Sequence, residues 1–499
     1  MKNNGIISNA LILTIGGFLA KVFSAVYRIF LTRILGGVGI GLYQLVFPFY
    51  SLCIVLATAG VPMAVSKIVS KNKGNKKYVL RKCLICFSIL GLVLSFVLAV
   101  FSGCISTLQG NKSLTVCYLI LAPSILLIAN SSVLKGYFQG VNCFVPSSVS
   151  NILEQGIKML VGLTVTLILI KQSVLAAVVG AVVSVVVGEV VSVIVLILFL
   201  KKGKDKTKNN VQLFVKDLLK DVGPIMLTNL ILPLANFVDS MLIVNLLGVN
   251  FSNAQAVFLY GLESGAVSSL INLPTIFSFA IASVIMPNLA NEFTKAKSEK
   301  LCLSIKIIVL ITLPCCILFI LSPNKVINLL YSTSVNDIGI DGIIISSRLL
   351  ALSSLGVLFL SVNQLLSVSL QAVDKGMVTV RNLSISVMLK FVLELLFMPS
   401  SILNIYVLAV ANVSCYMLTM LLNFLEVKQT FKIRLEVEFF IKVLISALIF
   451  MFFLILFSNI KDILGFILVC LLSALCYLFA ILKFGFLNKK EQAMFKYKR

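Results

Sequence analysis

The stretch KVFSAVYRIFLTRILGG, residues 21–37, closes the first long apolar run of the chain, which begins near Ile6. Lys21 and Arg28 are seven residues apart, so a helix places them on nearly one face, about 10 Å apart along its axis. A cation near the centre of a bilayer costs roughly 2.5–3.5 kcal/mol on insertion scales. Lys21 and Arg28 therefore predict a water-filled cavity, an acidic partner or an anionic ligand. Arg33 fits the same site or an interfacial position, where its side chain snorkels to the headgroups.

The composition indicates a polytopic membrane protein. Of the 499 residues 60% are hydrophobic, and the mean hydropathy is +1.10, whereas soluble chains are about 45–50% apolar. The net charge of +24 lies mostly in short segments between apolar runs, where it is a topology signal. No aromatic stacking platform accompanies a basic stripe, which argues against a nucleic-acid partner.

The apolar runs predict an all-α fold with about fourteen transmembrane helices, because a span needs roughly 20 apolar residues. Their approximate predicted extents are 6–31, 40–66, 83–107, 114–136, 147–170, 174–200, 222–247, 257–286, 302–322, 342–370, 378–400, 404–426, 440–458 and 463–486.

Lysine and arginine concentrate in alternate connecting segments, such as 67–82, which holds no acid, and 201–220. This alternation predicts a cytoplasmic-membrane protein with both termini in the cytoplasm. Lys2 and the apolar run after it resemble a secretory signal, but no clear A-x-A site follows, so we expect no cleavage.

A weak internal repeat divides the chain. When FQGVN at 138–142 is aligned with LQAVD at 370–374, Lys158 falls on Lys390 without a gap. Six spans per copy is an even number, so both copies enter the membrane in one direction, and a binding site is expected between them near mid-depth. The predicted parts are an N-terminal bundle, a cytoplasmic linker, a C-terminal bundle, and two further helices with a basic tail: 1–200, 201–221, 222–427 and 428–499.

Among the cations inside predicted spans, Lys21, Arg28 and Arg348 have no acid three or four residues away. They are the better candidates for an anion such as phosphate, which the planar fork of arginine binds through two hydrogen bonds. Lys158 and Lys390 each have a glutamate at i±4, Glu154 and Glu394. These are either two self-contained ion pairs or two symmetric lysines at a central cavity.

The remaining intramembrane acids are candidates for ion coupling or charge pairing. Asn236 and Asp239 are three residues apart, so one helix face could coordinate a cation, take up a proton, or hold a satisfied carboxylate. Glu189 and Glu263 complete this set.

No motif for catalysis, metals or cofactors stands out. The chain has no histidine and no GxxxxGK[ST] sequence, which excludes Ser-His and Cys-His arrangements and a P-loop. Its twelve cysteines lie mostly in apolar runs, and the CxxC of Cys83 and Cys86 has no second pair. We therefore predict neither an enzyme nor a cofactor.

Several segments resemble the multidrug/oligosaccharidyl-lipid/polysaccharide (MOP) flippase superfamily, and its stage V sporulation protein B branch in particular. They are AVYRIFLTRILGGVGIGLYQLVFPFYSL and ATAGVPMAVSKIVSK in residues 17–71, GYFQG at 136–140, IxEQ at 152–155 and IMPNLA at 285–290. The resemblance implies two six-helix bundles around a central cavity, and flipping of an undecaprenyl-pyrophosphate-linked precursor, lipid II or a relative, for spore cortex peptidoglycan. The related lipid II flippases carry cavity arginines in their first helix, where this chain has Lys21 and Arg28.

Our leading interpretation is a flippase that works by alternating access, with a lipid-linked oligosaccharide pyrophosphate as substrate and membrane lipids around it. One alternative is a cation-coupled drug exporter of the same fold, which would prefer an acidic cavity. Others are a membrane glycosyltransferase or polymerase, and a scaffold for cell-wall synthesis or the sporulation machinery.

Overall fold

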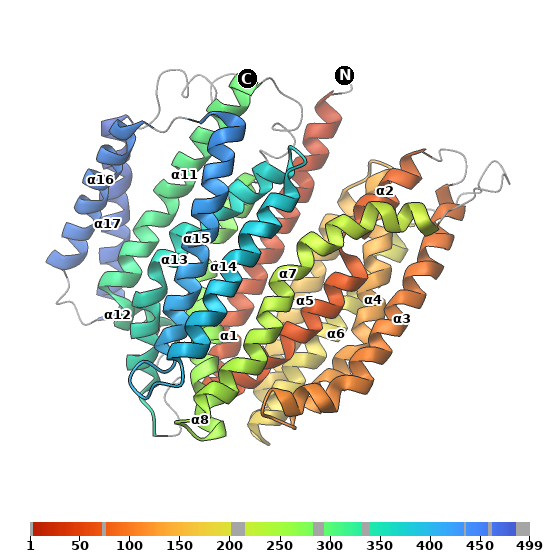
Figure 1. Cartoon of the computed structure of the whole chain (residues 1–499), viewed down its shortest axis with the longest axis horizontal. Helices are drawn as coiled ribbons and strands as arrows, with labels where there is room; N and C mark the ends of the chain where they lie inside the picture. The colour runs from red at the N-terminus through yellow and green to blue at the C-terminus, as the bar shows by residue number, and fades with distance from the viewer. Residues whose placement is uncertain are drawn as a thin grey trace. The chain divides into compact units, whose positions relative to one another are not determined.

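The computed structural model describes residues 3–71, 76–200, 215–282, 294–331, 339–433, 436–457 and 462–485. Every element in these ranges is a helix (Figure 1). Within the described residues, eleven helices are long and apolar enough to cross a membrane, or twelve when one bent pair counts as a span. The predicted all-α membrane fold is confirmed.

The chain divides into two compact units. Unit 1 comprises Met1–Gly265 with Asn336–Ile340, and unit 2 comprises Ala266–Val335 with Asp341–Arg499. Most of the predicted linker, residues 201–214, and the predicted basic tail from residue 486 lie outside the described residues. The four predicted parts of the chain stay a prediction.

Unit 1 is a bundle in which successive helices pack as antiparallel neighbours, notably α3 with α4 and α5 with α6. Its helices are α1 (Asn3–Thr58), α2 (Val61–Lys71), α3 (Lys76–Leu108), α4 (Leu114–Gly140), α5 (Val145–Leu169), α6 (Val174–Leu198), α7 (Val215–Leu247), α8 (Asn253–Gly261) and the start of the π-helix η1 (Leu262–Val267).

One residue breaks α1. Gly36 has a φ of 68° and a ψ of −174°, a conformation that glycine adopts without the steric cost of a Cβ. The break falls between the first two predicted spans, 6–31 and 40–66, but the expected connecting segment is a single residue. The predicted spans 6–31 and 40–66 therefore count as one candidate span, and α14 is not among the eleven candidates. For these reasons the structure gives fewer candidate spans than the predicted number of about fourteen. That count stays a prediction.

Glycines let α1 and the segment of α8 and η1 cross at close range. A Cβ on Gly261 would collide with the carbonyl oxygen of Gly37 and stand 2.7 Å from the backbone nitrogen of Gly41. A Cβ on Gly265 would meet the side chain of Ile40. Small residues four apart on two helices allow such backbone contact in membranes, so this crossing holds α8 against α1 within unit 1.

Unit 2 packs α13 and α15 against each other, with α14 on α15 and the hairpin of α16 and α17 beside α11. The predicted span 257–286 is bent by 49° between Asn253–Asn272 and Thr275–Ala282, where Pro274 interrupts the helix. The helices of unit 2 are α9 (Ser268–Asn272), α11 (Thr294–Leu321), α12 (Pro323–Tyr331), α13 (Gly342–Gln371), α14 (Gly376–Phe397), α15 (Tyr406–Phe431), α16 (Val437–Leu456) and α17 (Ile463–Phe484).

Candidate substrate-binding site

Arg28 projects from α1 toward the π-helix. Its Nη2 donates a hydrogen bond of 2.7 Å to the backbone carbonyl oxygen of Ser264, and Nε2 of Gln44 donates to the same oxygen at 3.1 Å. Ser264 belongs to η1, and π-turns within α-helices occur frequently at functional sites. Arg28 is thus oriented in part by a backbone carbonyl of the π-helix.

Lys158 projects from α5 between aromatic rings. Its Nζ lies 5.7 Å from the ring centre of Tyr27 and 5.9 Å from that of Phe47, which are cation–π distances. The Tyr27 hydroxyl lies 3.3 Å from Oγ of Ser184, and Gly162 leaves room for it. Arg28 is close enough to Lys158 to interact with it electrostatically.

Two glutamates and a further lysine complete the group. Glu154 forms an ion pair with Lys135 of α4 at 3.6 Å and accepts a hydrogen bond from its neighbour Gln155. Glu189 of α6 interacts electrostatically with Glu154, Lys135 and Lys158. A Cβ at Gly188 would stand 3.0 Å from the carbonyl oxygen of Glu154, so this glycine lets α6 approach the acids.

We call Arg28, Lys135, Glu154, Lys158 and Glu189 the cationic centre of unit 1. It holds three cations and two acids, drawn from α1, α4, α5 and α6. The ion pair of Glu154 is with Lys135; the structure shows no equivalent pair with Lys158 among the described residues. The excess of positive charge suits an anion.

In unit 2, Lys390 and Glu394 do form the predicted pair. Their charged atoms are 3.7 Å apart, and both side chains are buried. Because Lys390 and Lys158 belong to different units, a common cavity for the two stays a prediction.

The other predicted site residues are spread over both units. Lys21 is half-buried on α1, and Asp239 and Glu263 are buried in unit 1. Three are exposed: Arg33, Asn236 and Arg348. Within the described residues, these three exposed side chains form no hydrogen bond or ion pair with the cationic centre.

Sequence reasoning missed two parts of this site. Lys135 lies at the end of a predicted span, directly before the family-like GYFQG segment, and that adjacency was the available signal. Nothing in the sequence indicated the Ser264 carbonyl as an acceptor, because only the π-turn of the folded chain turns this backbone oxygen toward Arg28.

A helical bundle with charged residues within its apolar spans belongs to the class of polytopic membrane proteins. The family model described as "Polysaccharide biosynthesis protein" matches residues 6–293, which is more than half of the chain. The chain belongs to the polysaccharide biosynthesis protein family.

Two relatives come from Bacillus subtilis (strain 168). The uncharacterized membrane protein YabM is 26% identical over 62% of this chain and 60% of its own length. Stage V sporulation protein B is 24% identical over 60% of this chain and 61% of its own length. The matched part of the chain thus spans about three fifths of each of these relatives.

Two solved structures share the fold. A lipid II flippase MurJ in an inward closed conformation matches with a TM-score of 0.73, 18% identity, and 94% and 98% of the two chains covered. An inward-facing multidrug resistance MATE family transporter of the MOP superfamily matches with a TM-score of 0.66, 17% identity, and 85% and 98% covered. The predicted fold is confirmed by these two structures, of which one is named a flippase and the other a transporter of the MOP superfamily.

Proposed function

We propose that this chain is a flippase that moves a polyprenyl-pyrophosphate-linked saccharide across the cytoplasmic membrane. The observation that carries the proposal is the position of Lys158 against the ring of Tyr27, the residue directly before Arg28, which brings two cations into one region of unit 1. Two cations that are partly buried in a membrane bundle are costly, and a pyrophosphate brings the opposite charge that would offset this cost.

The residues of the cationic centre would act in sequence. The guanidinium of Arg28 has five N–H donors in a rigid fork, so it can bind phosphate oxygens while it holds the Ser264 carbonyl. Lys158 would leave the rings of Tyr27 and Phe47 and supply a second charge. Glu154 and Glu189 would then lose part of their compensation, which favours uptake of a proton or cation at these acids.

Transport would follow alternating access, with the headgroup inside the protein and the polyprenyl tail in lipid. The inside-negative membrane potential favours outward movement of an anion by about 2.3 kcal/mol per charge per 100 mV. No covalent step is needed. A lipid II-like substrate for spore cortex peptidoglycan is the specific proposal, supported by the likeness to stage V sporulation protein B and to the MurJ structure.

The drug exporter remains the second candidate, because the MATE fold is shared. A cationic drug would be repelled by Arg28 and Lys158. One experiment separates the two functions. Purified protein in liposomes should flip labelled lipid II and should not move a cationic dye. Dye transport without lipid II flipping would replace our proposal with the drug exporter.

A further inference from the structure

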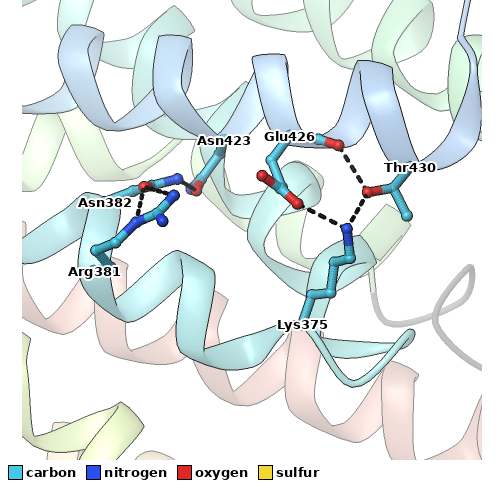
Figure 2. Close-up of polar contacts among 6 residues, drawn as sticks. All are labelled: Lys375, Arg381, Asn382, Asn423, Glu426 and Thr430. Atoms are coloured by element: carbon cyan, nitrogen blue, oxygen red, sulfur yellow. Dashed lines mark hydrogen bonds and ion pairs between the residues drawn. The ribbon is translucent and has the colours of Figure 1, made fainter.

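A chain of buried amides ends at an exposed arginine in unit 2 (Figure 2). Arg381, near the start of α14, donates through Nε and Nη2 to Oδ1 of Asn382, at 3.4 and 3.3 Å. Asn382 donates to Asn423 at 2.9 Å, and Asn423 donates to Asn363 at 2.8 Å and to Ser367 at 3.2 Å. We call these residues the asparagine relay.

The arginine fixes the direction of the whole relay. Because a guanidinium only donates hydrogen bonds, Oδ1 of Asn382 must face Arg381, and its amide nitrogen must face Asn423. For the same reason, Oδ1 of Asn423 faces Asn382, and the amide nitrogen of Asn423 faces Asn363. Asn382 and Asn423 are 2% and 0% exposed, and a buried, fully satisfied network of this kind is rigid. The relay therefore holds Oδ1 of Asn382 toward the guanidinium of Arg381.

On the C-terminal side of Arg381, the same face of α14 is apolar and exposed. Ile385, Met388, Val392 and Leu395 follow at intervals of four, three, four and three residues, and they are 50%, 64%, 48% and 50% exposed. This spacing forms one stripe along a helix. From Ile385 to Leu395 the stripe is about 15 Å long, or half of the roughly 30 Å hydrocarbon core.

The charge at the head of the stripe is a single positive one. The neighbouring Lys375 is compensated, because its Nζ lies 2.7 Å from Oε1 of Glu426 and 3.0 Å from Oγ1 of Thr430 (Figure 2). Among the described residues, Arg381 has only the amide of Asn382 as a partner. A neutral amide leaves the positive charge of the guanidinium available to an anion.

We propose that Arg381 and the exposed stripe of α14 form a binding site for an anionic glycerophospholipid. The phosphodiester, with one negative charge, matches the one guanidinium and accepts two parallel N–H bonds. An acyl chain of one leaflet matches the length of the stripe. A pyrophosphate carries more charge and suits the several cations of the cationic centre instead. The site lies in unit 2 and does not depend on the proposed flippase function.

The experiment titrates the full-length protein in phosphatidylcholine nanodiscs with phosphatidylglycerol and counts bound lipid by native mass spectrometry. Arg381→Gln should weaken phosphatidylglycerol binding about tenfold or more, the effect of one charge-assisted hydrogen bond. Arg381→Lys keeps the charge but not the fork and should give an intermediate loss. Lys428→Gln removes another exposed cation of unit 2 and should leave binding unchanged.

Two further variants test whether the relay positions the arginine. Asn423→Leu should weaken binding although Arg381 is intact; Ser367→Ala, a milder change, should do so to a smaller extent if Asn423→Leu does not fold. If Arg381→Gln and Lys428→Gln weakened phosphatidylglycerol binding equally, the binding would depend only on the overall positive charge. That result would overturn the proposal. Displacement of bound phosphatidylglycerol by equimolar undecaprenyl pyrophosphate would overturn the assignment to a phospholipid.

Discussion

Replacing Arg28 with alanine tests the cationic centre most directly. The change removes a charged hydrogen bond of 2.7 Å to the Ser264 carbonyl, which contributes about 1.5–3 kcal/mol to the free energy of unfolding. If Arg28 also binds pyrophosphate with a similar contact, affinity for the headgroup should fall roughly 10- to 100-fold. Flipping of labelled lipid II in proteoliposomes with equal protein content should therefore be lost. Arg28→Lys should restore it only in part, because lysine lacks the fork.

The chain provides a matched control at Gln44, which donates to the same oxygen at 3.1 Å. Gln44→Leu removes a neutral hydrogen bond worth about 0.5–1.5 kcal/mol and leaves the positive charge in place. It should lower the melting temperature slightly and retain flipping. If the two variants lose flipping in parallel with their loss of stability, Arg28 serves only to hold Ser264. Flipping at the wild-type rate by Arg28→Ala would refute the anion site altogether.

Three further predictions follow from the structure and the charge pattern. A cysteine introduced at Ser252 into a cysteine-free background should react with an impermeant reagent from outside the cell, whereas one in the predicted linker should react only after permeabilisation; the reverse pattern would contradict the topology. Lys390→Met should cost about 3–5 kcal/mol of stability, because it removes the ion-pair partner of the buried carboxylate of Glu394, and Lys390→Met with Glu394→Leu should regain most of it. Gly261→Ala should lower the melting temperature through a clash with α1, at a cost of about 1–3 kcal/mol, whereas Gly103→Ala, with no atom within 4 Å, should not.

The membrane fold could be predicted from the sequence because it depends on local quantities. Apolar length and the positions of charged residues are properties of each segment by itself, and they are sufficient to predict helical spans. The break at Gly36 was harder to place, because a glycine pair follows Leu35 and either residue could have taken the positive φ. The bend at Pro274 lay within a predicted span, where a proline kinks some helices and ends others.

The candidate site was only partly predictable, because its partners come from distant segments. Glu154 and Lys158 satisfy the i,i+4 rule, which takes account of one helix only. In the structure Lys135, on another helix, pairs with Glu154, and two aromatic rings of α1 surround Lys158. A rule based on spacing along one helix cannot choose between a local partner and one that tertiary packing supplies.

Two buried hydrogen bonds occupy matching positions in the two copies of the internal repeat. In the register that aligns Lys158 with Lys390, Ser150 aligns with Asn382. Ser150 bonds Ser192 of the following helix at 2.7 Å, and Asn382 bonds Asn423 of the following helix at 2.9 Å. The partners lie 42 and 41 residues further along the chain. A buried polar contact thus joins the same pair of helices in each predicted copy.

The two aligned lysines nevertheless differ in how readily they could move to a ligand. Lys390 is bound to Glu394 on its own helix, with both side chains buried, and its departure would break this buried ion pair at a cost of several kcal/mol. Lys158 would leave two aromatic rings, a contact worth about 0.5–2 kcal/mol, while Lys135 continues to compensate Glu154. Lys158 is therefore the lysine that an anion can recruit at low cost. We expect the phosphates of the substrate to bind at unit 1, beside Arg28, and Lys390 to have a structural role.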